Sequence, residues 1–237
     1  MTDFVFIHGG SHGAWCWDDV ISILEAKGFR CFAFDLPGHG DDQTARETVT
    51  RELYVEACIS FIANIDSDDI TLVGHSLAGI VLPDLTERFE GKISTVIYLA
   101  ALVLNRGQAA IDLVPEDRRA SYGEMANARS DKSIHLDYDA ARSLFLSDLP
   151  ESEARNIYKR LNPQPYAVYL SPAKYDALQA GVNYRYIVCL RDNALPQDKC
   201  RGWAEQLGVV IEEIDSGHDA MLSNAVRLSE LLMKEDE

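Results

Sequence analysis

A serine between small residues is the first candidate for chemistry in this chain. Ser76 follows an apolar run that ends in Gly74-His75, and Leu77-Ala78-Gly79 come after it. A serine hydroxyl is a weak nucleophile at neutral pH, so an enzyme presents it on a tight strand-to-helix turn, beside a histidine base and backbone N–H donors. The usual pattern is G-x-S-x-G, and Ala78 replaces the last glycine. We interpret Ser76 as a nucleophile, with a strand-ending turn as the alternative.

A glycine-rich turn is the second candidate. It reads His8-Gly9-Gly10-Ser11-His12-Gly13-Ala14-Trp15 and follows the first apolar run. Bare backbone of this kind can direct N–H groups into a cavity, and we expect the N–H groups of Gly10 and Leu77 to form an oxyanion hole. Removing one such donor typically slows an enzyme by about 10²- to 10³-fold. The alternative is a simple tight turn.

A late histidine supplies the candidate base. His218 follows Gly217 at a turn, and Asp192 ends another apolar run in a loop, where it could accept a hydrogen bond from the histidine Nδ1–H. Asp215 and Asp219 are rivals for the acid, but residues so close in sequence to a histidine rarely reach its ring nitrogen from the correct side. Structural or substrate-contacting roles are expected for the other histidines, at positions 8, 12, 39, 75 and 135.

The elements that would position these residues alternate along the chain. Short β-branched or aromatic runs predict strands at 4–7, 29–34, 70–74, 94–101, 184–190 and 208–214. Amphipathic stretches predict helices at 17–27, 47–64, 77–90, 198–207 and 220–234. This alternation is typical of an α/β fold, here a mainly parallel six-stranded sheet flanked by helices. Sites in such sheets form outside the carboxyl ends of the strands, where the candidate residues lie.

The alternation breaks between about Leu102 and Gly181, where no strand is convincing. Residues 139–145 and 151–161 look helical before Asn162-Pro163-Gln164-Pro165 interrupts them. We predict a helical cap at 103–181, inserted between the fourth and fifth strands of a core formed by 1–102 and 182–237. The expected walls of a substrate pocket are Ser11, Trp15, Leu77, Leu102, Phe145, Tyr158, Tyr166 and Tyr169. For the cap aromatics, packing of the cap on the core is the alternative.

Composition limits the class of protein. A net charge of −16 argues against nucleic acid or an anionic membrane as a partner. The five cysteines show no C-x-x-C spacing and are expected to be reduced and mostly buried. A strand beginning at Phe4 leaves no room for a signal peptide, and no apolar run is long enough to span a bilayer. We expect a soluble cytoplasmic protein, with a homodimer left open.

In these motifs the chain resembles the α/β-hydrolase superfamily, and within it the branch of plant methylesterases and hydroxynitrile lyases with their small bacterial esterase relatives. The resemblance rests on Phe6–Trp17, Gly74–Leu77, Tyr186–Cys189 with Asp192 and Pro196, and Gly217–Leu222. The order Ser76, Asp192, His218 is that of the superfamily. The resemblance implies hydrolysis of small carboxylic esters, often methyl or aryl, and the bacterial relatives include carbamate- and pyrethroid-hydrolysing esterases. It implies no metal and no organic cofactor.

Three positions differ from what members of that branch carry. The lyases carry a threonine where this chain has Gly9, and a lysine directly after the catalytic histidine, where this chain has Asp219. A carboxylate cannot take the part of that cation. Plant methylesterases usually carry methionine at the position of Asp219 and glycine at that of Ala78. The sequence therefore favours a serine hydrolase acting on a small ester or methyl carbamate. A lyase on the same fold and a non-catalytic ligand-binding protein are the alternatives.

Overall fold

A parallel sheet forms the centre of the molecule. The computed structural model describes residues 2–234, and six strands in this range are hydrogen-bonded in the order β2-β1-β3-β4-β7-β8, each parallel to its neighbours. Their bounds are β1 Asp3–Ile7, β2 Cys31–Ala33, β3 Ile70–His75, β4 Ile93–Leu99, β7 Asn183–Cys189 and β8 Val210–Ile214. The predicted α/β fold with a six-stranded sheet is confirmed, and the sheet is parallel throughout.

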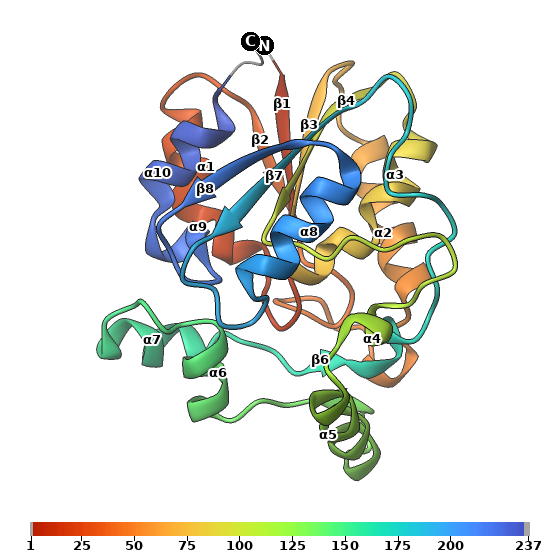
Figure 1. The fold of residues 1–237 in the computed structure, drawn as a ribbon, viewed down its shortest axis with the longest axis vertical. Coiled ribbons are helices and arrows are strands. Elements are labelled where there is room, and N and C mark those ends of the chain that lie inside the picture. The colour runs from red at the N-terminus through yellow and green to blue at the C-terminus, as the bar shows by residue number, and fades with distance from the viewer. Residues whose placement is uncertain (1, 235–237) are drawn as a thin grey trace.

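Helices cover both faces of this sheet, as Figure 1 shows. One face carries α1 Asp18–Glu25, α9 Ala220–Ser223 and α10 Ala225–Leu232, and the other carries α2 Arg51–Ala63, α3 Leu82–Arg88 and α8 Gln197–Leu207. Each face buries its own apolar cluster. Strands β1 and β3 are buried along their whole length because helices lie on both sides of them, which explains their nearly continuous apolar sequence.

Three helices are shorter than predicted. The expected helix 77–90 is the 3₁₀ turn η3 Ser76–Ile80 followed by α3, because the chain must turn sharply after the strand and Pro83 lies at the start of the next helix. The expected helix 47–64 begins only at Arg51, after the short 3₁₀ turn η2 Arg46–Thr48, since the Thr50 hydroxyl accepts from Leu53 N–H at 3.3 Å. The expected helix 220–234 is divided at Asn224.

Residues 100–182 lie between β4 and β7 and contribute the cap segment. Figure 1 shows its elements gathered beyond the carboxyl ends of the strands. They are α4 Ala110–Leu113, α5 Glu116–Ala128, β5 Ser133–Ile134, α6 Tyr138–Leu144, α7 Glu151–Tyr158, β6 Gln164–Pro165 and the 3₁₀ turn η4 Tyr166–Tyr169. The predicted helices 139–145 and 151–161 correspond to α6 and α7. The domain boundaries at 103 and 181 stay a prediction.

Two features of the cap segment differ from expectation. Helix α5 was not predicted, because its sequence EDRRASYGEMANA is polar and has no apolar stripe. The expectation that this region holds no strand was wrong, since β5 and β6 pair antiparallel. Each has only two residues, and their pairing joins positions about thirty residues apart, so neither leaves a periodic signal in the sequence.

Two further observations concern the described part of the chain as a whole. None of its helices is long and apolar enough to cross a membrane. Its five cysteines are unpaired, and all except the partly exposed Cys31 are buried, as the sequence predicted.

Candidate active site

The turn after β3 holds Ser76 in an unusual backbone conformation. Its φ angle is 54°, in the left-handed region that residues with a side chain rarely adopt. Close packing surrounds the turn: a Cβ atom added at Gly79 would lie 2.0 Å from the Leu102 carbonyl oxygen, and one at Gly74 would lie 2.8 Å from Leu82. The glycine that this elbow requires is therefore Gly79, while the position of Ala78 accommodates a methyl group.

The structure brings Ser76, His218 and Asp192 together from three strand ends. His218 Nε2 lies 2.8 Å from Ser76 Oγ, and His218 Nδ1 lies 2.7 Å from Asp192 Oδ2. The other carboxylate oxygen of Asp192 accepts from the backbone N–H groups of Ala194 and Leu195 at 2.7 and 2.9 Å. The loop after β7 thus fixes the carboxylate, and the carboxylate fixes the ring.

The electrostatics of His218 suit a base. Burial alone would lower the pKa of His218, but the charge and hydrogen bond of Asp192 outweigh burial, so that the pKa is raised above its usual value. With Nδ1–H donating to the carboxylate, Nε2 is free to receive the serine proton. The arrangement can therefore draw a proton from Ser76 and hold the resulting charge.

Two backbone N–H groups adjoin Ser76 at the cavity. Leu77 lies in the first turn of η3, where an N–H has no intrahelical acceptor, and the N–H of Gly10 has no acceptor among residues 2–234. Both residues line the cavity with Ser76. At Gly9 an added Cβ would lie 2.9 Å from the Ser76 Cβ, so this turn passes directly against the serine. The geometry is compatible with the oxyanion hole expected from the sequence.

The turn that contains Gly10 is held from two sides. On one side the Ser11 N–H donates to Gln164 Oε1 at 3.1 Å, and Gln164 belongs to β6 of the cap segment. On the other side His12 Nδ1 lies 2.8 Å from the Gly10 carbonyl oxygen. His39 Nε2 also lies 3.1 Å from Gln164 Oε1. A buried polar network therefore fixes the backbone on which Gly10 is carried.

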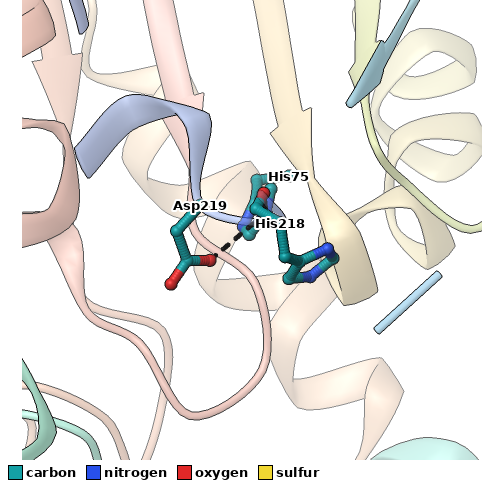
Figure 2. Close-up of side chains that lie close together, drawn as sticks. All are labelled: His75, His218 and Asp219. Carbon is teal, nitrogen blue, oxygen red and sulfur yellow. Dashed lines mark hydrogen bonds and ion pairs between the residues drawn. The ribbon is translucent and has the colours of Figure 1, made fainter. Parts of the chain in front are cut away.

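Asp219, the rival for the acid, makes other contacts. It is fully buried, with Oδ2 3.0 Å from His12 Nε2 and Oδ1 3.7 Å from His75 Nε2. Figure 2 shows Asp219 and His75 beside His218, with the contact between Asp219 and His75 as a dashed line. The two ring nitrogens of His12 thus lie between two oxygen atoms, the Gly10 carbonyl oxygen and Asp219 Oδ2. Asp219 therefore orients His12 rather than His218.

His75, His218 and Asp219 each offer a ligand atom within 4.8 Å of the others, a spacing that could suggest a metal site. Each residue already has a partner: His75 Nε2 lies 3.1 Å from the His218 carbonyl oxygen, both nitrogens of the His218 ring have partners, and Asp219 Oδ2 lies 3.0 Å from His12 Nε2. Among their polar side-chain atoms, His75 Nδ1 and Asp219 Oδ1 have no hydrogen-bond partner in the described chain. Burial, followed by the neighbouring His218 and His12, lowers the pKa of His75 well below its usual value. The cluster is a hydrogen-bonded support for the His218 loop.

The cavity above Ser76 has a volume of about 140 Å³. Of the expected wall residues, it is lined by Ser11, Leu77, Leu102, Phe145 and Tyr169.

Trp15, Tyr158 and Tyr166 do not line it. The Arg160 guanidinium covers the Trp15 ring at 4.3 Å, and the Tyr158 hydroxyl donates to the Leu136 carbonyl at 3.1 Å. Tyr166 packs near Gly123 of α5. Trp15 thus packs between core and cap, whereas the cited contacts of Tyr158 and Tyr166 lie within the cap segment itself.

The cavity also has walls that the sequence did not identify. They are Leu113, Val114, Pro115, Arg118, Tyr122, Ile134, Leu136, Leu144, Gln164, Ala194, Leu195, Pro196 and Lys199. One signal was available, because Arg118 and Tyr122 are four residues apart and so share a face of helix α5.

The comparison with known families agrees with this geometry. A family model described as "Alpha/beta hydrolase family" matches residues 4–231, which is nearly the whole chain. The protein belongs to the alpha/beta hydrolase family. That assignment accounts for both the sheet and the Ser76 elbow.

Two curated relatives extend the assignment. A pheophorbidase of Raphanus sativus is 31% identical over 252 residues, covering 99% of this chain and 94% of the relative. A relative of Arabidopsis thaliana named "Putative methylesterase 11, chloroplastic" is 29% identical over 81% of this chain, and the chain spans about half of its length, 53%. The predicted resemblance to the plant methylesterase branch is confirmed, and it places the chain among esterase-type members of the family.

Solved structures agree on the fold. An extracellular alpha/beta-hydrolase from a Paenibacillus species superposes with a TM-score of 0.90 at 24% identity, covering 98% of both chains. A pyrethroid hydrolase from Sphingobium faniae JZ-2 superposes with a TM-score of 0.78 at 24% identity, covering 98% of this chain and 95% of its own. At this level of identity the likeness establishes the fold.

Proposed function

We propose that this alpha/beta hydrolase is a serine esterase that cleaves a small carboxylic ester through an acyl-enzyme on Ser76. One observation carries the proposal: Ser76 Oγ, His218 and Asp192 form a chain of hydrogen bonds of 2.8 and 2.7 Å that opens on an apolar cavity. The names of the curated relatives support the same class of reaction.

In the proposed reaction, His218 Nε2 takes the proton of Ser76 Oγ as the oxygen attacks the ester carbonyl carbon. The Asp192 carboxylate stabilises the imidazolium, and the N–H groups of Gly10 and Leu77 bind the oxyanion. When the tetrahedral intermediate collapses, the C–O bond to the alcohol breaks and His218 gives the alcohol its proton. Water then repeats these steps on the acyl-enzyme and releases the acid.

The cavity supports a small substrate. Its volume of about 140 Å³ is below the range of about 300–1,000 Å³ that is usual for ligand pockets, which favours a small ester. Most of its walls are apolar, which favours a methyl or aryl ester. A methyl carbamate belongs to the same proposal, because its carbonyl is attacked in the same way although it is less electrophilic.

A short substrate panel tests the proposal. Wild-type protein and Ser76→Ala are assayed with p-nitrophenyl esters, aryl methyl carbamates and mandelonitrile. We expect ester turnover in the wild type and a loss of at least about 10³-fold in Ser76→Ala. Ester turnover that persists in Ser76→Ala, or none in the wild type, would contradict the proposal. Release of cyanide from mandelonitrile in place of ester turnover would instead favour the lyase alternative, which Asp219, engaged with His12, does not support.

A cytoplasmic location stays part of the proposal, although one relative is named chloroplastic and one similar structure is titled extracellular. Fractionation of the native source tests it. Light scattering distinguishes a monomer from the homodimer that the sequence left open.

A further inference from the structure

The cavity above Ser76 carries positive charge in an acidic protein. The chain has 38 acidic and 22 basic residues, yet the cavity is lined by the two cations Arg118 and Lys199 and by no carboxylate of the described chain. The rest of the lining is apolar, aromatic or neutral polar. The charge of the cavity lining is positive, whereas the net charge of the molecule is negative. The positive charge is therefore a local property of the cavity.

The two cations lie where the cap segment meets the core. Arg118, on α5, donates from Nη1 to the Ala194 carbonyl oxygen at 3.3 Å, which places its guanidinium beside the loop that follows Asp192. Lys199 lies in the first turn of α8, which begins after that same loop. Arg118 also adjoins Tyr122, where burial raises the pKa of the phenol and the Arg118 charge opposes the shift.

Neither cation is neutralised by a carboxylate whose position the structure describes. The buried arginines elsewhere are paired, Arg51 with Asp84 and Arg185 with Glu212. Arg118 is half-buried, and a cation beside apolar walls gains most from an anionic partner because the local dielectric constant is lower than that of water, whereas the exposed Lys199 gains less. A ligand that brings its own negative charge would supply this partner.

We propose that the ester substrate carries a carboxylate remote from its scissile carbonyl, and that Arg118 and Lys199 bind it. This inference rests on the proposed esterase function and narrows its substrate class to half-esters of dicarboxylic acids. A guanidinium presents paired N–H donors that match the two oxygens of a carboxylate, and the ammonium of Lys199 adds a second charge. With a net charge of −16, the protein repels anions at long range, so local cations are needed to admit one.

Matched substrate pairs test the inference. The monomethyl and dimethyl esters of straight-chain dicarboxylic acids of increasing length differ by one charge at the far end, and kcat/KM is measured for both. We expect at least one acid of the series to show a preference for the monomethyl ester, and this preference to fall as salt is added, since salt screens the interaction.

The variants are Arg118→Gln and Lys199→Gln, with Arg106→Gln as the control. Arg106 is exposed and outside the cavity, so its variant removes the same charge elsewhere. The ratio of kcat/KM for the monomethyl over the dimethyl ester should fall roughly tenfold in Arg118→Gln and about threefold in Lys199→Gln, and stay at the wild-type value in the control. Lys199 is exposed, so its variant keeps the fold and tests the inference even if Arg118→Gln does not.

The outcomes separate this inference from the proposed function. If the dimethyl esters are hydrolysed in a Ser76-dependent way but the ratio is the same in all variants, the carboxylate site is wrong and the esterase stands. If no ester of either kind is hydrolysed, the proposed function itself fails and the inference falls with it.

Discussion

Contacts with neighbouring backbone hold Ser76 in its strained conformation. A non-glycine residue in the left-handed region costs on the order of 1 kcal/mol, and neighbouring contacts must hold it there. Here the Leu102 N–H donates to the Ser76 carbonyl oxygen at 3.0 Å, and Gly79 lets the Leu102 backbone approach closely enough for that bond. The strain at the serine is thus tied to the start of the cap segment.

Gly79→Ala should destabilise the protein, because the new methyl group would lie 2.0 Å from the Leu102 carbonyl oxygen and the two backbones would have to separate. Overpacking of this kind costs typically 1–3 kcal/mol, which lowers Tm by about 2–12 °C in a chain of this length. Thermal unfolding of the variant measures it. Ala78→Gly is the matched control and should lower Tm by less than about 3 °C. Equal decreases of Tm in the two variants would contradict the close approach of the Leu102 backbone to Gly79.

Asp192→Asn should change both the rate and its pH dependence. His218 acts as a base only when neutral, and because Asp192 raises its pKa, the rise of kcat/KM with pH is expected above the usual histidine value of 6.5. Without the carboxylate, burial dominates and the rise should move to lower pH, while kcat falls by about 10³- to 10⁴-fold. A pH series of kcat/KM on both proteins measures this. An unchanged profile would assign the role to another carboxylate.

At this scale the sequence was informative wherever a residue ends a strand. Ser76, Asp192 and His218 each follow a strand of the sheet, so topology alone predicts that they meet. The contact between His12 and Asp219 was not predicted, although these residues, 207 positions apart, also lie in loops that follow strands, β1 and β8. The only signal for this contact in the sequence was the residue type of Asp219, because related families carry other residues at that position.

The elements closest to the chemistry are two short ones, the turn after β1 and the strand β6. Gln164 of β6 accepts from the Ser11 N–H and donates to the Tyr54 hydroxyl at 3.2 Å, so one cap side chain joins the Gly10 turn to helix α2. Both Gln164 and Tyr54 are buried. The cap segment is therefore expected to position the oxyanion turn as well as to enclose the substrate.

Gln164→Leu tests this expectation. The variant keeps the volume but removes the acceptor for Ser11 N–H and leaves buried polar groups unpaired, which costs about 1–3 kcal/mol. We expect kcat to fall roughly tenfold with a smaller change in KM, because the oxyanion donors act mainly in the transition state. Steady-state kinetics measure the split. Gln179→Leu, at a partly exposed position outside the cavity, is the control, and a kcat for Gln164→Leu equal to that of the control would contradict the positioning role.

Elements of the core were easier to predict than those of the cap. Strands such as β1 and β3 are continuous apolar runs, and the order of strands and helices repeats. In the cap, helix α5 is polar because much of it faces solvent, and β5 and β6 exist only through their pairing. The aromatic candidates Tyr158 and Tyr166 failed as cavity walls because an aromatic side chain in a cap can equally well pack against other residues of the cap.

For the molecule as a whole, buried histidines link stability to pH. Burial lowers the pKa of His39 to about 4 and those of His8 and His75 well below the usual 6.5. His8 must stay neutral because its Nε2 accepts from the Leu36 N–H at 3.0 Å. Below about pH 6.5 the unfolded chain therefore binds protons that the folded protein does not. The free energy of unfolding consequently decreases as the pH is lowered.

Urea unfolding at a series of pH values measures this dependence. Each such histidine contributes up to about 1.4 kcal/mol per pH unit, present above the unfolded pKa and lost as pH falls toward the folded one. The free energy of unfolding should decrease by at least about 1 kcal/mol between about pH 6 and pH 5. His39→Gln should reduce the slope, and His135→Gln, at an exposed position, should not. A stability that is flat over this range would contradict the burial of neutral histidines.

The central claim is that Ser76 is the nucleophile, and covalent labelling tests it most directly. The protein is incubated with a serine-directed fluorophosphonate, its esterase activity is followed, and the modified peptide is identified by mass spectrometry. We expect one phosphonyl group per chain, attached to Ser76, with activity lost in proportion to labelling and no labelling of Ser76→Ala. Stoichiometric labelling at another residue, or full activity after Ser76 is modified, would contradict it.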